Sequence, residues 1–408
     1  MGVMKALILG INFFPELTGI GKYTGEMAGY LSEQGVDVTV ITAPPYYPSW
    51  KIHPDYKNSY SKQTWKNIIV YRCPLFIPRH VNGFSRILHL MSFAISSLPH
   101  VIYQSFNKFD VIFTIEPTLL TAFFASIMFS KQRQKKWLHI QDFEIDAAFS
   151  LGILNHQFLN KLLLNWERRI YQKFDVISSI SHKMTERAKE KAASNALISF
   201  FPNWIDVQAV YPKTISDIRI NCQFKPSDIV LLYSGSIGQK QGFESLFGAM
   251  QYLVKNKNIH LVVCGEGAGK AELQRAASGN ANIHFLPLQP TEQFNDLINL
   301  ADIHVLPQKN MAADIVMPSK LLGILASGRP VIAECLEGSE LYSIVSKVGV
   351  VTYPDDAYGF AQNVLKLATN PSLRSELGKL GREYAVSHYS KEAVLASFLS
   401  ILRKVSID

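Results

Sequence analysis

Short apolar runs rich in β-branched residues recur along this chain, and their spacing restricts the fold most. Six such runs lie in the first half, and stretches with helical periodicity, such as Tyr23–Glu33 and His156–Tyr171, lie between them. Strands that alternate with helices build a parallel sheet from βαβ units. The alternation pauses at residues 201–216, which are rich in proline and polar residues, and a second series of six runs follows. The sequence therefore predicts an α/β protein with two doubly wound, Rossmann-like domains.

The two series give the expected domain boundaries. A chain of 408 residues is long enough for two or three domains. We expect an N-terminal domain over residues 1–208 and a C-terminal domain over residues 209–385. The expected strands are 5–10, 36–42, 68–72, 110–115, 136–140 and 175–180 in the first domain, and 228–235, 259–265, 282–288, 302–307, 330–334 and 348–353 in the second.

Composition narrows the class of protein. Hydrophobic residues make up 48% of the chain and charged residues 18%, which is typical of a folded, apolar-rich protein. The four cysteines are scattered without ligand spacing, so neither a disulfide framework nor a structural zinc site is expected. The apolar run at the N-terminus is short and lacks a cleavage site, and no window reaches a membrane span of about 18 apolar residues. We expect a cytoplasmic protein.

The positive charge lies in the N-terminal half. Residues 1–206 carry 22 Lys and Arg against 15 Asp and Glu, whereas the remainder carries 19 against 18. A basic half can meet nucleic acid, an anionic membrane surface or a phosphate-bearing acceptor. No nucleic-acid module is recognisable, so no nucleic-acid partner is expected.

A glycine-rich loop follows the first strand of each series. In the first, Gly19 and Gly21 precede a helix that we expect to begin near Lys22, whose N-terminal amides would favour a phosphate. In the second, glycines surround Ser236, Lys240 and Gln241, which could bind a diphosphate. The alternatives are a plain turn in the first loop and a solvated lysine in the second.

Residues 313–334 form a third region of interest. Pro318 suits the first position of a helix, which places Ser319 and Lys320 in its first turn. A lysine there opposes the helix dipole unless an anion binds nearby, and Asp314 lies one turn earlier. A surface lysine and a capping aspartate are the alternative interpretation.

Polar residues also follow two strands of the first series. His139 could exchange a proton near neutral pH, and Asp142 lies just beyond it in an acidic stretch. Glu116 follows the neighbouring strand at the same edge. The acidic stretch could be a metal site, but solvated or capping carboxylates are more common and no histidine or cysteine completes a ligand set. No metal is expected.

In this order the motifs resemble those of retaining glycosyltransferases with the GT-B fold, specifically family four and its WcaI-like group of bacterial exopolysaccharide transferases. The resemblance covers nearly the whole chain. Its carriers are NFFPELTGIGKY, HIQDFEIDAAFSLGIL, FPNWID, YSGSIGQKQG, CGEG, ADIHVLPQ and MPSKLLGILASGRPVIA.

The resemblance implies that two domains face each other across a cleft and that the C-terminal domain binds a nucleotide diphosphate sugar. The final helix, about 386–408, would cross back onto the first domain. The sugar would be transferred with retention, the leaving diphosphate would help to deprotonate the acceptor, and no metal cofactor would be needed. The residues implied are His139, Asp314 and Lys320 for catalysis; Gly19, Gly21, Lys22, Ser236, Lys240, Gln241, Gly265, Leu288, Met317, Pro318, Ser319 and Leu321 for the donor; and Glu116 and Asp142 for the acceptor.

The chain departs from the family pattern at two places. Ser236 and Gln241 stand where many members carry an arginine and a lysine, a role that Lys240 and Lys320 could take. Ile315 and Gly323 stand where many carry two glutamates; Asp314 could replace the first, and no substitute for the ribose-binding acid is evident.

The function expected is therefore transfer of a hexosyl group, with UDP-glucose as the most common donor, to a polysaccharide or lipid-linked oligosaccharide in exopolysaccharide biosynthesis. Residues 87–103 and 119–129 could make peripheral contact with an anionic membrane, and burial of the same segments in the core is the alternative. The alternatives are transfer from a GDP-sugar (fucosyl or mannosyl), a sugar-nucleotide 2-epimerase, and a non-catalytic nucleotide-sugar-binding protein.

Overall fold

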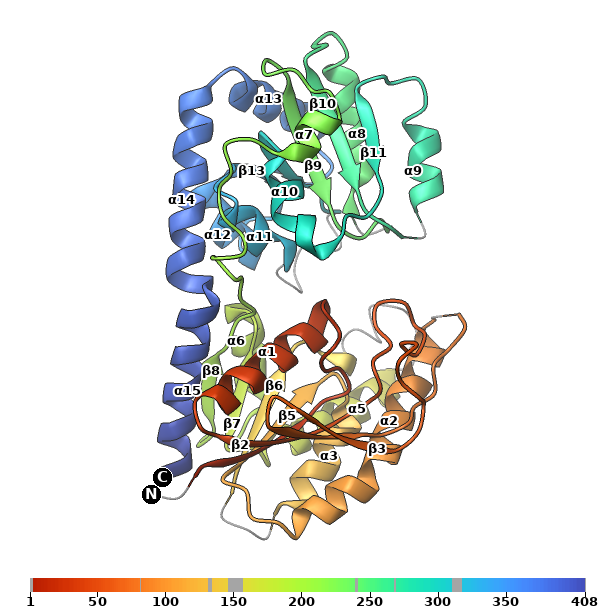
Figure 1. Cartoon of the computed structure of the whole chain (residues 1–408), viewed down its shortest axis with the longest axis vertical. Coiled ribbons are helices and arrows are strands. Elements are labelled where there is room, and N and C mark those ends of the chain that lie inside the picture. The colour runs from red at the N-terminus through yellow and green to blue at the C-terminus, as the bar shows by residue number, and fades with distance from the viewer. Residues whose placement is uncertain are drawn as a thin grey trace. The chain divides into compact units, whose positions relative to one another are not determined.

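A computed structural model of the chain describes residues 3–80, 82–130, 134–145, 157–238, 241–267, 269–309 and 318–407. The chain divides into two compact units, which Figure 1 shows. The first unit holds residues 1–202 and 395–408, and the second holds residues 203–394. Each unit is built on one largely parallel sheet with helices on it, so the predicted α/β class with two doubly wound parts is confirmed.

The first unit has an eight-stranded sheet in the order β3-β4-β2-β1-β5-β6-β7-β8. Its strands are parallel except at the β3 edge, where β3 runs antiparallel to β4. The strand order reverses between β1 and β5, and ligands of open α/β sheets bind beyond the carboxyl ends of strands at such a switch point. The elements are β1 (Lys5–Leu9), α1 (Gly19–Glu33), β2 (Asp37–Thr42), β3 (Ser61–Trp65), β4 (Ile68–Arg72), α2 (Gly83–Ser105), β5 (Val111–Glu116), α3 (Leu119–Met128), β6 (Lys135–Ile140), α5 (Gln157–Tyr171), β7 (Val176–Ser179), α6 (His182–Lys191), β8 (Leu197–Phe200) and most of α15 (Lys391–Ile407).

Successive residues of a strand point to opposite faces of the sheet, and both faces of this one are covered. On one face Ile112 of β5 lies in a core cluster with Phe93 of α2 and Ala125 of α3. On the other face Phe113 of β5 contacts Phe398 of α15, with the ring centroids 5.4 Å apart. Burial on both faces explains why the central strands read as continuous apolar runs.

The second unit has a six-stranded parallel sheet in the order β11-β10-β9-β12-β13-β14. Here the strand order reverses between β9 and β12. The elements are α7 (Asp217–Asn221), β9 (Ile229–Ser234), α8 (Phe243–Tyr252), β10 (Ile259–Cys264), α9 (Lys270–Ala276), β11 (Ile283–Leu286), a 3-10 turn (Thr291–Gln293), α10 (Phe294–Asn299), β12 (Ile303–Leu306), α11 (Lys320–Ala326), β13 (Val331–Glu334), α12 (Glu340–Val348), β14 (Val350–Thr352), α13 (Ala357–Ala368) and α14 (Pro371–Tyr389).

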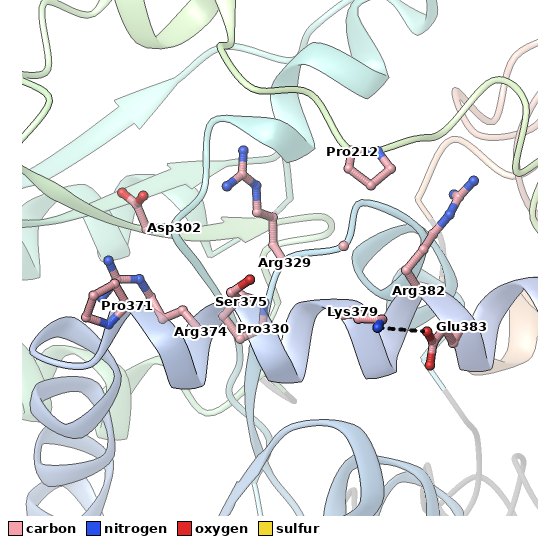
Figure 2. Close-up of a pocket in the computed structure, with 11 residues that line it drawn as sticks. Pro212, Asp302, Arg329, Pro330, Pro371, Arg374, Ser375, Lys379, Arg382 and Glu383 are labelled. Atoms are coloured by element: carbon pink, nitrogen blue, oxygen red, sulfur yellow. Dashed lines mark ion pairs between the residues drawn. The ribbon is translucent and has the colours of Figure 1, made fainter.

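A hollow beside α14 in the second unit is lined by several basic side chains (Figure 2). Arg382 donates to the backbone carbonyls of Val207, Val210 and Ala326 at 2.6 to 2.8 Å. Arg329 likewise donates to the carbonyl of Lys213 at 2.7 Å. These guanidinium groups therefore hold the segment after residue 202 against α14 and the end of α11, which is a structural role.

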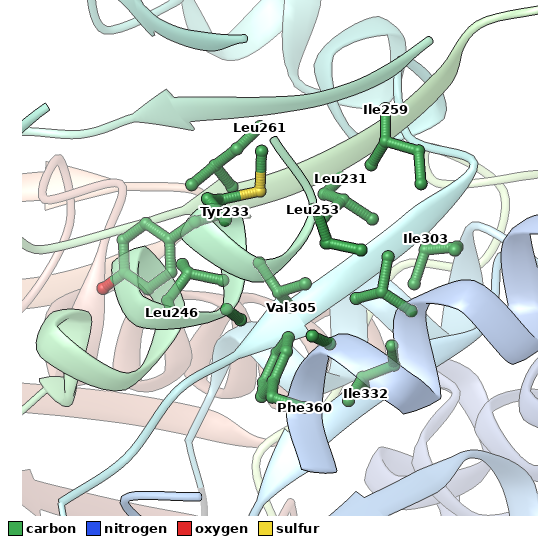
Figure 3. Packing of buried hydrophobic residues seen from close by; sticks show 14 of the residues in the cluster. Leu231, Tyr233, Leu246, Leu253, Ile259, Leu261, Ile303, Val305, Ile332 and Phe360 are labelled. Carbon is green, nitrogen blue, oxygen red and sulfur yellow. The ribbon is translucent and has the colours of Figure 1, made fainter. Parts of the chain in front are cut away.

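The main core of the second unit lies between its sheet and helices α8 and α13. Figure 3 shows Leu231, Leu261 and Val305 from three neighbouring strands together with Leu246 of α8 and Phe360 of α13. All five side chains are buried. Their packing fixes the strand ends from which the candidate site is built.

The structure corrects the sequence prediction at four elements. β3 and β8 were not predicted; both are edge strands, and β3 is polar and largely exposed, whereas β8 is a short run of four residues. α1 begins at Gly19 and not near Lys22, so the glycines lie in its first turn. α11 begins at Lys320 and not at Pro318, since Ser319 is the residue that precedes the helix.

Candidate active site

The switch point of the second unit lies between the loop after β9 and the segment after β12. Gly235 opens the β9 loop with a φ of +139°. Its amide donates to the carbonyl of Cys264 at 3.0 Å, and the amide of Ile237 donates to that of Glu266 at 2.8 Å. A Cβ at Gly265 would overlap the carbonyl oxygen of Gly235. The loop thus lies backbone to backbone against the β10 loop, which requires glycine at both positions.

Lys320, the first residue of α11, reaches back to this loop. Its Nζ donates to the hydroxyl of Tyr233 at 2.9 Å and lies 4.1 Å from the centre of that ring. A Cβ at Gly235 would lie 3.2 Å from the same Nζ. The Tyr233 ring belongs to the core cluster, with its hydroxyl at the cluster's edge (Figure 3), and this hydroxyl donates to the carbonyl of Ser236 at 2.5 Å. Tyr233 therefore fixes both the ammonium group and the glycine loop.

The charge of Lys320 has no carboxylate partner among the described residues. Burial lowers its pKa to about 8, and no neighbouring charge contributes to that shift. By contrast, Lys309 in the same unit pairs with Glu244 at 2.7 Å, and Lys213 pairs with Asp296 at 2.7 Å. A charge removed from water without a partner is costly unless a ligand supplies one. The site is therefore suited to an anion, and phosphate is the obvious chemical class.

The remaining residues predicted for the site in the second unit differ in how the structure places them. Ser236 and Ser319 are exposed, and Leu288 has 61% of its surface exposed, as a contact to a base would need. The side-chain oxygen of Gln241 accepts from the amide of Gly238 at 3.1 Å, so this glutamine closes the loop. Leu321 is fully buried in the core, contrary to a contact through its side chain. Pro318 is partly exposed, whereas Lys240, Asp314 and Met317 lie outside the described residues.

Glu334, at the carboxyl end of β13, belongs to the same edge and was not predicted. Its carboxyl group accepts from the Ser245 hydroxyl of α8 at 2.5 Å and from the amide of Gln308 at 3.1 Å. Burial raises its pKa to about 7. It therefore links the helix after the glycine loop to the start of the segment that leads to Lys320. An acid at the end of an otherwise apolar strand is the signal that could have identified it.

In the first unit, the loop after β1 is organised around its own charges. The buried carboxylate of Glu16 accepts from the amides of Tyr46 and Tyr47, both at 2.9 Å. Arg72, also buried, donates to the carbonyls of Phe14 at 2.5 Å and Ala43 at 2.8 Å. These bonds fix the loop to the strand ends beside it.

The glycines of that loop make room for Glu16. A Cβ at Gly21 would overlap the Glu16 carboxylate, and Gly19 has a φ of +59° with Tyr47 beside it. Lys22 is partly exposed, with its Nζ 5.6 Å from the centre of the Tyr23 ring. The glycines thus have an internal role, and their contact with a phosphate stays a prediction.

His139 does not fit the role expected of it. It is 3% exposed, its ring nitrogens lie 2.9 Å from the Ser178 hydroxyl and 3.1 Å from the Gln141 amide nitrogen, and Phe201 packs on its ring. Burial lowers its pKa to about 3. The expectation that it exchanges a proton near neutral pH is therefore wrong, because the charged imidazolium would be buried without a counter-charge.

Glu116 is also buried, at 1% exposure, and lies on the opposite face of the sheet from His139. It accepts from the Tyr171 hydroxyl at 2.7 Å, and burial beside Glu167 raises its pKa well above the usual range. The structure therefore does not bring His139 and Glu116 together as one acceptor surface. Asp142 is partly exposed, and its carboxylate lies 3.4 Å from Arg86. Within the described residues no group of three or more histidine, cysteine or acidic side chains could hold a metal ion.

Comparison with known proteins identifies the family. Residues 18–204 match the family model described as glycosyl transferase 4-like domain, and residues 215–384 match that of glycosyl transferases group 1. Over 98% of its length the chain is 35% identical to an Escherichia coli K12 protein named as colanic acid biosynthesis glycosyl transferase WcaI, which is covered completely. The chain belongs to the WcaI-like glycosyltransferases of family four.

Solved structures agree with the fold of this glycosyltransferase. The sucrose-phosphate synthase of Thermosynechococcus elongatus superposes with a TM-score of 0.72 at 16% identity, covering 98% of this chain and 99% of that one. HepE of Anabaena, in complex with UDP and glucose, gives a TM-score of 0.69 at 12% identity, with 98% and 100% covered. The predicted GT-B fold is confirmed, and so is the enzyme class.

Proposed function

We propose that this glycosyltransferase moves a hexosyl group, with retention, from a nucleotide diphosphate sugar to a polysaccharide or lipid-linked oligosaccharide at the inner face of the membrane. UDP-glucose is the donor that we favour, and exopolysaccharide biosynthesis is the pathway class. The observation that carries the proposal is the ammonium group of Lys320. It lies beside a glycine loop at the switch point of the second sheet, with no carboxylate partner among the described residues.

In this proposal Lys320 acts on the leaving group. Breaking the bond between the sugar and the diphosphate adds negative charge to the leaving oxygen, and a fixed ammonium group next to it lowers the energy of that state. Tyr233 keeps the ammonium in place, so little reorganisation is needed when the charge develops. The exposed Leu288 would offer a surface for the base.

The proton of the acceptor hydroxyl would pass to the leaving diphosphate on the same face of the sugar. This route needs no protein base, and the buried His139, whose pKa is lowered to about 3, would be a poor proton acceptor. We further propose that transfer needs no metal ion. Transfer should then persist in excess chelator, and its loss with recovery on adding a divalent cation would refute this part of the proposal.

The donor is tested by a thermal-shift screen of UDP-, GDP- and dTDP-sugars with the full chain. A ligand that binds the folded protein raises its melting temperature, and at equal ligand concentration the rise grows with the logarithm of the affinity. We expect the largest rise with UDP-glucose. A larger rise in melting temperature with GDP-fucose or GDP-mannose would change the donor that we assign and leave the assigned site unchanged. Retention is checked separately from the anomeric configuration of the product by NMR.

A further inference from the structure

The outer side of helix α2 is apolar along its whole length. Phe84 and Ile95 of α2, and Phe106 directly after its last residue, expose 68%, 58% and 80% of their surface. Residues of the same kind fill the positions between them at steps of three or four, which is the spacing of one helix face: Leu88, Met91, Leu98 and Ile102. α2 lies on the outside of the first unit next to α3 (Figure 1). We call the seven residues the α2 stripe.

The opposite side of α2 is the side that packs on the unit. His89, Phe93 and Val101 are buried there. A surface helix normally turns its apolar side to the core and a polar side to water. α2 is apolar on both sides, and its 23 residues span about 34 Å. An exposed apolar surface of that extent marks a contact with another apolar phase or partner.

The segment of the chain that carries the α2 stripe is basic. Residues 56–109 contain seven Lys and Arg and no Asp or Glu. Arg79 is exposed just before the helix and Lys108 just after it. Lys62 is exposed too. It lies near the middle of the helix, since Tyr60 on the same segment donates to the carbonyl of Ser96 at 2.9 Å.

Acids outside this segment offset part of its charge, since Glu33 lies 3.1 Å from Lys66 and Asp142 lies 3.4 Å from Arg86. Asp55 lies 3.6 Å from the His53 ring, and Asp110 accepts from the backbone amide of Lys5 at 2.7 Å. The exposed Lys62, Arg79 and Lys108 have no acidic partner among the described residues, so an excess of positive charge remains on this segment. A positive rim around an apolar face is complementary to anionic headgroups above hydrocarbon.

We propose that the α2 stripe, with Lys62, Arg79 and Lys108, docks the first unit on the surface of an anionic phospholipid bilayer. The helix would lie in the plane of the interface with its apolar side among the upper acyl chains. Among the described residues no helix is long and apolar enough to cross a membrane. A second copy of the chain fits less well, because pairing the two stripes would bring like charges together.

This inference extends the membrane side of the proposed function and does not depend on its donor. None of its residues belongs to the donor site of the second unit. Nucleotide affinity and vesicle binding can therefore fail separately, and one result cannot be mistaken for the other.

The test is flotation of the full chain with vesicles of phosphatidylcholine alone or with about one third phosphatidylglycerol, in 0.15 M salt. We expect binding to the anionic vesicles only, weakening as salt rises. Replacing Lys62, Arg79 and Lys108 together by glutamine should weaken it on the order of a hundredfold, since each cation contributes about fivefold. Replacing Phe84, Ile95 and Phe106 by serine should abolish it.

A matched control replaces Ile220, Tyr252 and Val254 by serine. These residues of the second unit are similarly exposed, at 60%, 60% and 49%, and the triple variant should bind vesicles like the wild type. Thermal unfolding and UDP affinity establish that each variant is folded. No binding by the wild type, or equal binding by the stripe variant, would overturn the proposal. So would a dimer in sedimentation that the stripe variant loses while vesicles are not bound.

Discussion

The loops after β1 and after β9 look alike in sequence and differ in charge balance. Each follows the first strand of its unit, is rich in glycine and leads into a helix. The β1 loop contains a buried carboxylate, Glu16, and a buried guanidinium, Arg72, both with backbone partners. Against the β9 loop, the described residues place the ammonium of Lys320 from α11, without a carboxylate partner among them. A glycine-rich loop can thus have its buried charges compensated within the protein, or it can present an uncompensated charge that a ligand would neutralise.

The largest effect is expected in the first loop. Arg72→Ala should lower the free energy of unfolding by about 3–5 kcal/mol, because two buried carbonyls lose their donor and Glu16 loses a nearby positive charge. Chemical denaturation measures this change in the free energy of unfolding. The exposed Arg79→Ala should change the stability by less than about 0.5 kcal/mol. Similar small losses for both variants would mean that the first loop is not held by its own charges.

The second loop should respond in the opposite direction. Lys320→Met keeps the length of the side chain and removes the unpaired charge, so it should raise the stability of the ligand-free protein by up to about 3 kcal/mol at pH 7. Lys309→Met, which breaks the exposed pair with Glu244, should change it by no more than about 1 kcal/mol. If Lys320→Met destabilised the protein strongly, the charge of Lys320 would be compensated within the protein and would not be available for a ligand.

The same stabilisation should depend on pH. The pKa of Lys320 is lowered from 10.5 to about 8 in the folded protein. The charged form therefore costs stability fully below pH 8, and this cost fades as the pH rises from 8 towards 10.5. The difference between Lys320→Met and the wild type should accordingly shrink between pH 7 and pH 10. A difference that stays constant over this range would assign the effect to packing.

A smaller effect tests the glycines of the first loop. Gly21→Ala should cost about 1–3 kcal/mol, because its Cβ would overlap the Glu16 carboxylate. Gly29→Ala in the same helix meets Trp65 at 3.5 Å, an ordinary contact, and should be neutral or stabilising by up to about 1 kcal/mol through helix propensity. Equal effects of the two substitutions would remove the internal role assigned to Gly21.

The sequence was sufficient for the strands with continuous apolar runs, the two-part organisation and the enzyme class. It missed β3, because polar residues on an edge strand give no periodic signal. Lys320 could be singled out from its place at a helix start. That its ammonium lies against Tyr233 depends on contacts 87 residues apart, which spacing does not show. His139 illustrates the converse, since a polar residue at a strand end turned out to be packed under Phe201.

The most direct test of the account is the affinity of UDP for the second unit's loop, measured by calorimetry on the full chain near pH 7. Lys320→Ala should weaken UDP binding by about 1–3 kcal/mol, as expected for a lost hydrogen bond to a charged group. Lys309→Ala and the wild type should bind UDP alike, and uridine, which carries no phosphate, should not distinguish the three proteins. An unchanged UDP affinity in Lys320→Ala would contradict the assignment of Lys320 to the diphosphate.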